Sequence, residues 1–388
     1  MDERRILQVA SVDVTIKAFL LPLFDALLEE GYEVEGACAL SSIGKQLIES
    51  GYVIHNIPFR RKLISIFHVK AAWRLLGLIN HRKYQVIHVH TAMAAAIVRF
   101  VAKLAGVPTV IYTAHGFYLN ENMNMLAQAA VVTVEKILGR WATDWLFAVS
   151  SETAELANKC RFLSHDRIIY IGNGVDLSKF GSGALRNKHR ETLGIEDNEQ
   201  VIGFVGRLVE EKGIFDLVEA FHIVKKTYAN AKLLVIGDTL ESDRDTHVKS
   251  KLKEKIVTYD LEESVILTGF REDIPELLAA MDVFCLPSYR EGMPMSILEA
   301  MASSLPVVAT NISGSREAVL EGITGTLVPV RSPWKLADAL IEMLSDQEHA
   351  ARLGRAGRER VAAAFDEKTV ISTQLELYRE IFNAADGH

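Results

Sequence analysis

Two carboxylates, Glu291 and Glu299, lie eight positions apart in the stretch "REGMPMSILEAM" at residues 290–301. Two acids this close could form the acid/base pair that cleaves a glycosidic bond, which requires that they flank the bond and that one sits in an apolar pocket. Pro294 suits the first turn of a helix, so Glu291 precedes the helix and Glu299 lies more than one turn inside it. Two acids at the start of one helix are poorly placed to lie on opposite sides of one bond. We therefore interpret the two acids as ligands for hydroxyl groups, because a carboxylate accepts hydrogen bonds from neighbouring hydroxyls of a sugar ring or a ribose.

The segment between the two acids could contribute backbone groups to the same site. Gly292, Met293 and Met295 surround the predicted helix start, where N–H groups have no helical partner. Hydroxyls or a phosphate could bind there. The alternative for this stretch is a pair of solvated acids on a helix surface.

A second candidate site follows the strand-like run "VIGFVG". This run ends in Gly206, Arg207 comes next, and Lys212 and Gly213 open a predicted helix. N–H groups at a helix start favour a phosphate, a guanidinium can bind two of its oxygens, and a lysine supplies a point charge. The alternative is an ordinary helix entry with solvated cations. The spacing matches neither a GxxxxGK[ST] phosphate loop nor a GxGxxG nicotinamide fingerprint.

The elements that must position these residues follow a βα rhythm. Short β-branched runs such as "QVIHVH", "PTVIYTA", "KLLVIG" and "DVFCLP" alternate with amphipathic segments, which predicts α/β architecture with doubly wound parallel sheets. A Gly-Asn-Gly turn followed by a polar segment predicts a domain boundary near residue 178. We expect an N-terminal domain at 1–178, a C-terminal domain at 179–366, and a helix at 367–388 that packs back on the N-terminal domain. Ligands of such sheets bind at the carboxyl ends of the strands.

Composition excludes several classes of protein. The chain has 388 residues and a net charge of -7, which gives a nucleic-acid partner no support. The cysteines Cys38, Cys160 and Cys285 are far apart, so neither a disulfide framework nor a zinc knuckle is expected. No signal-peptide pattern and no long apolar run is present, which predicts a cytoplasmic protein or one peripheral to the inner face of the cytoplasmic membrane.

Six motifs together resemble one known family. "GRLVEEKG", "EGMPMSILEAM", "PVVATNISGSREAV" and "GITGTLVP" resemble the successive signatures of retaining glycosyltransferases with the GT-B fold, family four or "group 1". "IGNGVDLSKF" and "TAHGF" fit the same family, and the match runs from about residue 5 to 382 in the family's order. The resemblance implies two Rossmann-like domains that face each other across a cleft. It also implies a nucleotide-sugar donor held mainly by the C-terminal domain and an acceptor held mainly by the N-terminal one.

The resemblance assigns roles to the candidate residues. Arg207 and Lys212 would hold the donor diphosphate and stabilise the departing nucleotide by charge, which needs no metal and no cofactor. Glu299 would bind the ribose hydroxyls, and Glu291 the transferred sugar. His115, in "TAHGF", would reach across the cleft to a sugar hydroxyl.

Further donor contacts are implied at two other segments. "LTGFR" at residues 267–271, with Phe270 and Arg271, would place backbone groups against the base, and Asn173 would lie at the hinge near the diphosphate. We expect transfer of a hexose or N-acetylhexosamine from a UDP-linked donor to a lipid-linked acceptor in cell-surface polysaccharide synthesis. The alternatives are a soluble acceptor, a catalytically silent scaffold that binds sugar nucleotide, and a sugar-nucleotide epimerase.

The sequence departs from the family pattern in two places. The first strand is usually followed by a Gly-Gly pair, whereas Ser11, Val12 and Asp13 stand here, as in a branch used in bacterial polysaccharide assembly. The loop after Gly237 lacks the usual second glycine. Which backbone groups meet the substrates at these loops is therefore left open.

A basic stretch at residues 59–84 could contact a membrane. It contains no acid, it includes Phe67 and Trp73, and a solvated basic face over core residues is the equal alternative. Its seven cations are Arg60, Arg61, Lys62, Lys70, Arg74, Arg82 and Lys83.

Two patterns resemble metal sites only weakly. Asp243 and Asp245 form a DxD, which we interpret as a solvated helix entry, and His88 and His90 share one face of a strand, where we favour core or cleft-edge histidines. We expect no metal.

Overall fold

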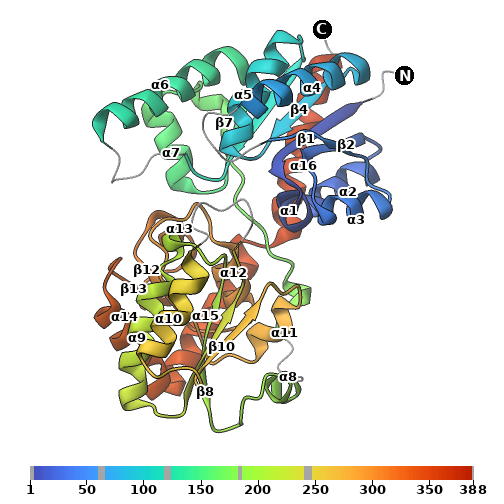
Figure 1. Ribbon diagram of the computed structural model, residues 1–388. Coiled ribbons are helices and arrows are strands. Elements are labelled where there is room, and N and C mark those ends of the chain that lie inside the picture. Colours follow the sequence, from blue (N-terminus) through green and yellow to red (C-terminus); the bar gives the residue numbers. More distant parts are fainter. Residues whose placement is uncertain (1–3, 60–65, 118–123, 182–185, 240–246, 387–388) are drawn as a thin grey trace. The chain divides into compact units, whose positions relative to one another are not determined.

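The computed structural model describes residues 4–59, 66–117, 124–181, 186–239 and 247–386. The chain forms two compact units (Figure 1). Unit 1 comprises Met1–Gly172 and Thr369–His388, and unit 2 comprises Asn173–Lys368. The stretch Arg60, Arg61 and Lys62 and the Asp243/Asp245 pair lie outside the described residues. No helix in the described ranges is both long and apolar enough to cross a bilayer.

Unit 1 is built on a parallel sheet. Its order is β3-β2-β1-β4-β5-β6-β7 within the described residues, and each neighbouring pair is parallel. The apolar runs of the sequence form these strands because a parallel sheet is covered on both faces. The strands are β1 Arg5–Val12, β2 Glu33–Ala39, β3 Ile54–Asn56, β4 Val86–Val89, β5 Thr109–Ala114, β6 Trp145–Ala148 and β7 Ile168–Tyr170.

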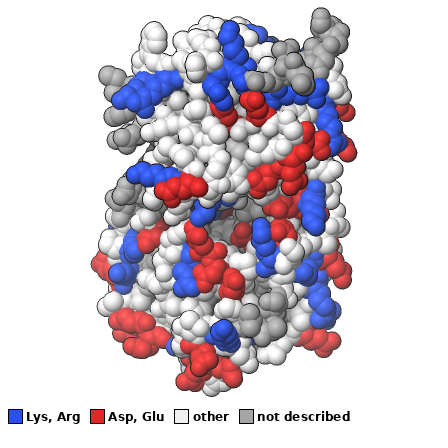
Figure 2. All heavy atoms as spheres, turned by 90° about the vertical axis from the view of Figure 1, so that its right-hand side faces the viewer, with Lys and Arg blue, Asp and Glu red and all other residues white. Residues whose placement is uncertain are grey.

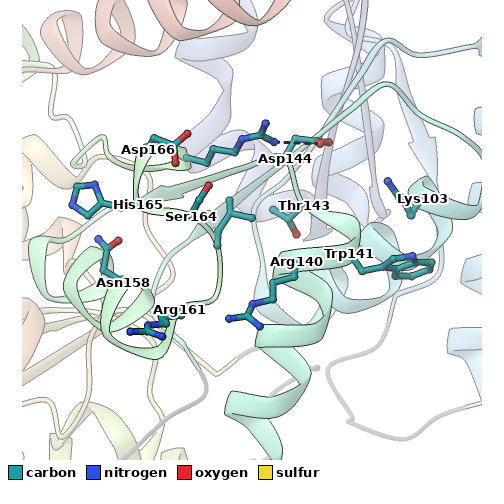
Figure 3. Close-up of a pocket in the computed structure, with 12 residues that line it drawn as sticks. Lys103, Arg140, Trp141, Thr143, Asp144, Asn158, Arg161, Ser164, His165 and Asp166 are labelled. Carbon is teal, nitrogen blue, oxygen red and sulfur yellow. Dashed lines mark ion pairs between the residues drawn. The ribbon is translucent and has the colours of Figure 1, made fainter.

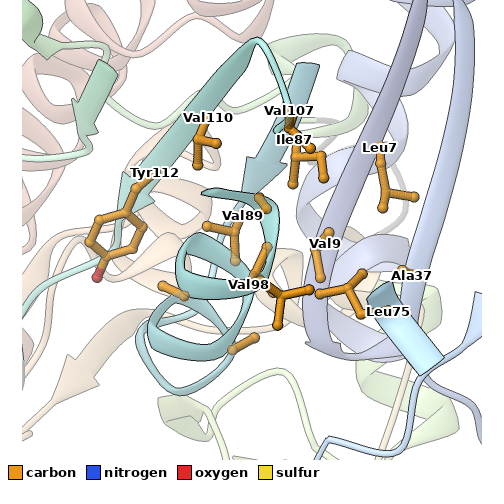
Figure 4. Close-up of a cluster of buried hydrophobic side chains, with 14 of the residues drawn as sticks. Leu7, Val9, Ala37, Leu75, Ile87, Val89, Val98, Val107, Val110 and Tyr112 are labelled. Atoms are coloured by element: carbon orange, nitrogen blue, oxygen red, sulfur yellow. The ribbon is translucent and has the colours of Figure 1, made fainter. Parts of the chain in front are cut away.

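Helices cover the sheet of unit 1, and α5 shows why. Its apolar residues recur at helical spacing, and Ala94, Val98 and Ala102 are fully buried with Val89 and Ile87 of the strands beneath (Figure 4). α4 packs beside α5, and α5 beside α6. The helices of unit 1 are α1 Asp13–Thr15, α2 Leu21–Glu29, α3 Ser42–Glu49, α4 Ile66–Arg82, α5 Ala92–Leu104, α6 Met125–Ala142, α7 Ser151–Cys160 and α16 Glu367–Asp386.

The residues that stand in place of the glycine pair end the first strand and begin the helix after it. β1 continues through Val12, and the buried Asp13 carboxylate accepts hydrogen bonds from the N–H groups of Ser41 and Gly44 at the start of α3. Asp13 therefore anchors α3 against the end of β1.

The C-terminal helix α16 reaches the centre of this sheet through a buried polar network. The Tyr378 hydroxyl lies 2.6 Å from Nδ1 of His88 and accepts a 2.8 Å hydrogen bond from Nε2 of Gln8. His88 Nε2 lies 2.6 Å from the Thr113 hydroxyl, and His90 Nε2 lies 2.6 Å from Oε1 of Gln8. His88 and His90 are therefore core histidines that join β1, β4 and β5 to α16.

This network predicts acid sensitivity. Burial lowers the pKa of His88 to about 3 and that of His90 well below its usual value. Below about pH 6.5 these histidines are protonated in the unfolded chain but stay neutral in the folded chain. The free energy of unfolding should therefore fall as the pH drops, by up to about 1.4 kcal/mol per pH unit for each such histidine. Calorimetric unfolding at a series of pH values measures this slope.

The control is the replacement of one imidazole by an amide. His88→Gln should be less stable than the wild type near neutral pH but should show a shallower loss towards acid pH. His81→Gln, at an exposed position of α4, is the matched variant. Equal slopes for His88→Gln and His81→Gln would contradict the expected role of His88.

Unit 2 contains the second parallel sheet. Its order over the described part of the chain is β10-β9-β8-β11-β12-β13, with parallel neighbours. The predicted α/β class with two Rossmann-like sheets is confirmed. The strands are β8 Gln200–Val205, β9 Ala231–Ile236, β10 Val265–Gly269, β11 Val283–Leu286, β12 Val307–Thr310 and β13 Gly325–Val328. The helices are α8 Arg186–Thr192, α9 Ile214–Thr227, α10 Val248–Thr258, α11 Ile274–Ala279, α12 Met295–Ala302, α13 Ser313–Ala318, α14 Pro333–Ser345 and α15 Gln347–Ala364.

Candidate functional site

The carboxyl edge of the unit 2 sheet gathers most of the candidate residues. Arg207 follows β8, Arg271 follows β10, and Glu291 follows β11. The carboxyl ends of parallel strands meet at one edge of a sheet, which is where such folds bind ligands. Residues far apart in the sequence thus become neighbours in one site.

The connection from β8 to α9 has the form that the sequence predicted. After Gly206 and Arg207, a single 3-10 turn ends at Lys212, and α9 begins at Ile214. Gly213 between them has φ 67°, and a Cβ there would lie 2.0 Å from the carbonyl oxygen of Pro287. Only glycine fits this position, and its close approach fixes Lys212 against the segment that follows β11.

Lys212 and Glu291 form an ion pair. Lys212 Nζ lies 2.5 Å from Oε1 of Glu291, and the two side chains are only 16% and 12% exposed. The Ser288 hydroxyl donates a 2.6 Å hydrogen bond to the same oxygen. Ser288 is fully buried, and its carbonyl oxygen accepts a hydrogen bond from Thr310. The pair is little screened by water, so Lys212 and Glu291 hold each other in place.

Arg207 is held by an acid that sequence reasoning missed. Arg207 Nη2 lies 3.3 Å from Oε1 of Glu211, and Arg290 Nη2 lies 3.2 Å from the other oxygen of the same carboxylate. The carbonyl oxygen of Glu211 also accepts a 2.8 Å hydrogen bond from the N–H of Tyr289. Glu211 therefore ties the β8–α9 connection to the segment after β11. Its only signal in the sequence was its place four residues after Arg207.

Glu299 has an environment opposite to that of Glu291. It lies on α12, which begins at Met295 directly after Pro294. In the described part of the structure its carboxylate has no hydrogen bond and no ion pair, and burial raises its pKa to about 7. One acid is thus paired with a lysine, whereas the other is a half-buried acceptor with free capacity for hydroxyl donors.

The segment between the two acids is fixed by backbone contacts. Asn173, the first residue of unit 2, donates from Nδ2 to the carbonyl oxygen of Met293 at 3.4 Å. A Cβ on Gly314 would lie 2.2 Å from the carbonyl oxygen of Gly292, so this loop packs tightly on the start of α13. The structure therefore brings together Asn173, Gly292, Met293, Met295 and both acids.

Phe270 and Arg271 follow β10 at the same edge. Phe270 is 58% exposed, which leaves its ring available to a flat ligand. The Arg271 guanidinium is bound to the carboxylate of Asp273, with Nε 2.7 Å from Oδ1. Arg271 is thus engaged within its own loop.

His115 belongs to unit 1, directly after β5. Its Nε2 is buried and has no hydrogen-bond partner among the residues that the structure describes. Burial lowers its pKa to about 4, so the imidazole is neutral near pH 7. A buried nitrogen without a partner has unused capacity for a hydrogen bond. The ring centroid of His115 lies 6.2 Å from that of His90.

The geometry of unit 2 suits an anionic ligand that carries hydroxyl groups. Arg207 and Lys212 supply positive charge, Glu299 supplies an acceptor, and an exposed ring lies nearby. Within the described ranges, no group of three or more His, Cys, Asp or Glu side chains could hold a metal ion.

Comparison with known proteins decides the family. The family model "Glycosyl transferases group 1" matches residues 186–360, and "Glycosyltransferase Family 4" matches residues 19–179. The chain belongs to the family-four glycosyltransferases. It is a transferase enzyme, and its two sheets are those of the GT-B fold. The family and the fold that the six motifs predicted are confirmed.

Relatives and solved structures agree with this assignment. The UDP-Gal:alpha-D-GlcNAc-diphosphoundecaprenol alpha-1,3-galactosyltransferase of Escherichia coli is 29% identical over 84% of this chain and 83% of its own length. The capsular polysaccharide biosynthesis glycosyltransferase CapM of Staphylococcus aureus is 27% identical over 90% of both chains. The crystal structure of Anabaena HepE with UDP and glucose has a TM-score of 0.83 at 21% identity, over 97% of this chain and 100% of that one. That likeness shows the fold.

Proposed function

We propose that this enzyme is a retaining glycosyltransferase that uses a UDP-sugar and a lipid-linked acceptor. It transfers a hexose or N-acetylhexosamine to an acceptor hydroxyl in the synthesis of bacterial cell-surface polysaccharide. The observation that carries the proposal is the Lys212–Glu291 ion pair beside Arg207 at the carboxyl edge of unit 2. The Escherichia coli relative, whose name states a UDP-galactose donor and a diphosphoundecaprenol-linked acceptor, supports the choice of substrates.

Each residue has a role that its environment supports. Arg207 and Lys212 bind the diphosphate and stabilise the negative charge that develops as UDP departs. Glu291, held by Lys212 and Ser288, accepts a hydrogen bond from a hydroxyl of the transferred sugar. Glu299 accepts hydrogen bonds from the ribose hydroxyls, and the backbone of residues 292–295 contacts the transferred sugar.

The chemical step is a substitution at the anomeric carbon. The bond from this carbon to the UDP oxygen breaks, the bond to the acceptor oxygen forms on the same face, and the acceptor proton passes to the departing phosphate oxygen. This route needs no protein nucleophile. The neutral His115 contacts a sugar hydroxyl, and the exposed Phe270 and the backbone of Arg271 contact the base.

A donor panel tests the choice of nucleotide. The melting temperature of the protein should rise with UDP-sugars and much less with GDP- or ADP-sugars. A ligand at 100 times its Kd adds about 2.7 kcal/mol to the free energy of unfolding. The result that contradicts a UDP donor is an equal or larger shift with another nucleotide.

A transfer assay separates the remaining alternatives. With a polyprenyl diphosphate saccharide as acceptor, we expect a product whose new glycosidic bond keeps the donor's anomeric configuration, as read by NMR. Stabilisation by UDP-sugars without any transfer would favour a silent scaffold, and transfer only to soluble acceptors would overturn the lipid-linked one. Isomerised donor would identify an epimerase.

A further inference from the structure

The outer face of helices α4, α5 and α6 in unit 1 carries no exposed acid. α4 and α5 contain no Asp or Glu, and the acid of α6, Glu135, is buried in a 2.9 Å ion pair with the fully buried Arg99. These helices nevertheless belong to a chain of net charge -7. By contrast, Figure 2 shows a face on which Asp and Glu lie among Lys and Arg.

Cations and large apolar side chains share this outer face. Lys70 and Arg74 on α4, Lys103 on α5 and Arg140 on α6 are exposed. The inward sides of α4 and α5 are already packed in the buried cluster of Figure 4, so the exposed apolar residues are surplus to the core. They include Val69, Trp73, Phe100, Leu104, Ile137 and Trp141, with Trp73 71% exposed.

A pocket continues this face at the ends of α5 and α6. It has a volume of about 950 Å³ and is lined by Lys103, Arg140 and Trp141 of the two helices (Figure 3). Arg161 and Arg167, from the end of α7 and the segment before β7, complete its basic lining. Of its two acids, Asp144 lies 4.0 Å from Nη1 of Arg167, which offsets its charge, and it accepts a 2.8 Å hydrogen bond from the N–H of Val110.

Helix dipoles explain only part of this pattern. Lys103 and Arg140 lie in the last turns of their helices, where a cation offsets the negative end of the dipole. That effect accounts neither for Lys70 and Arg74 near the start and middle of α4 nor for the exposed Trp73 beside them.

We propose that the outer face of α4, α5 and α6 docks on the anionic headgroups of a lipid bilayer. Lys70, Arg74 and Arg140 attract the headgroups, and Trp73 and Trp141 lie at headgroup depth, where the amphipathic rings of tryptophan are enriched. A basic helical face with exposed aromatic residues is typical of helices that lie at a membrane interface.

This inference extends the proposed function, because a lipid-linked acceptor is presented at a bilayer. It widens the docking surface expected from the stretch at residues 59–84. The new part is α5, α6 and the pocket, none of which belongs to that stretch.

The test uses the full chain and flotation with vesicles, without any sugar nucleotide. Binding to vesicles that contain phosphatidylglycerol should exceed binding to pure phosphatidylcholine vesicles and should weaken with salt. Each lost cation should weaken binding about fivefold, since one Lys or Arg near an anionic surface contributes about 1 kcal/mol. Arg140→Glu with Trp141→Ser, or Trp73→Ser with Arg74→Glu, should therefore reduce binding roughly tenfold or more.

Unit 2 offers a matched control. Trp334, 66% exposed, adjoins Lys335 on α14, so Trp334→Ser with Lys335→Glu likewise removes one tryptophan and one cation and should bind vesicles like the wild type. Trp141 contacts Phe100, with ring centroids 5.6 Å apart, so Arg140→Glu alone is also tested, and thermal unfolding checks each variant.

Three outcomes would overturn the inference. They are equal loss of binding in the unit 2 control, binding that does not depend on lipid charge, and saturable binding of glycerol 3-phosphate in place of vesicles. Vesicle binding without any sugar transfer would instead leave this inference intact and remove the proposed function. The two can therefore fail separately.

Discussion

Lys212→Ala is expected to reduce the rate of sugar transfer at least about 10²-fold, chiefly in kcat. Removing one preorganised group that stabilises charge in the transition state typically costs about 2.7–4 kcal/mol. In the proposed reaction the charge develops on the departing diphosphate, so the loss should exceed any change in donor affinity. Initial rates over a range of donor concentrations separate kcat from KM.

Because Lys212 is paired with Glu291, its loss should also affect stability. Without Lys212, the carboxylate of Glu291 keeps, among the residues that the structure describes, only the hydrogen bond from Ser288 and becomes an uncompensated, largely buried charge. Lys212→Ala should therefore also lower the melting temperature, and adding Glu291→Gln should restore part of the stability but none of the rate. This contrast distinguishes a catalytic lysine from a structural one.

Lys255→Ala is the matched control. Lys255 forms a 2.9 Å ion pair with Glu219 in the same unit, outside the candidate site. Its loss should leave the transfer rate close to that of the wild type. Near-normal turnover in Lys212→Ala would remove the diphosphate role of this residue.

The fold could be predicted from the sequence because most of the strands are parallel and largely buried. Runs such as "VIGFVG" and "DVFCLP" are apolar on both faces, and the amphipathic segments between them leave few other ways to cover a sheet. The β8–α9 connection was predictable as well, since glycine, arginine and lysine stand at fixed places around a helix start. The sequence therefore predicted the succession of strands and helices and the edge of the sheet at which the candidate residues lie.

Contacts between distant segments could not be predicted in this way. Thr310 donates a hydrogen bond to the carbonyl oxygen of Ser288 because β11 and β12 lie side by side, and Glu211 bridges to Arg290 across a separation of 79 residues. Asp13 looked like a departure near the substrates, yet its carboxylate anchors α3. The charge pattern indicated α4 as a basic surface, but the apolar residues of α5 and α6 became visible only once their outward side was known.

Glu299→Gln is expected to stabilise the ligand-free protein and to weaken donor binding. Burial without a cation raises the pKa of Glu299 to about 7, so ionisation is disfavoured in the folded state. Between the usual pKa of a glutamate and about 7 the folded chain binds more protons than the unfolded one, and stability therefore falls as the pH rises through this window. An amide carries no charge, so at about pH 8 the variant should gain up to about 3 kcal/mol in the free energy of unfolding.

Donor binding should change in the opposite direction. The carboxylate accepts hydrogen bonds from ribose hydroxyls, and a hydrogen bond to a charged group contributes roughly 1.5–3 kcal/mol, so Glu299→Gln should weaken UDP-sugar binding about 10- to 100-fold. In the wild type, affinity should also decline as the pH falls below about 7, because a protonated Glu299 must first lose its proton. The variant should lack this decline.

Calorimetric unfolding and donor titration over the same range of pH measure both effects. Glu254→Gln, at an exposed position of α10, is the matched control and should change neither. Unchanged stability of Glu299→Gln would show that ionisation of the half-buried carboxylate does not destabilise the folded chain, and unchanged affinity would remove its role at the ribose. A gain in stability with a loss of affinity would instead show that the site keeps a destabilising, partly desolvated carboxylate in order to bind its donor.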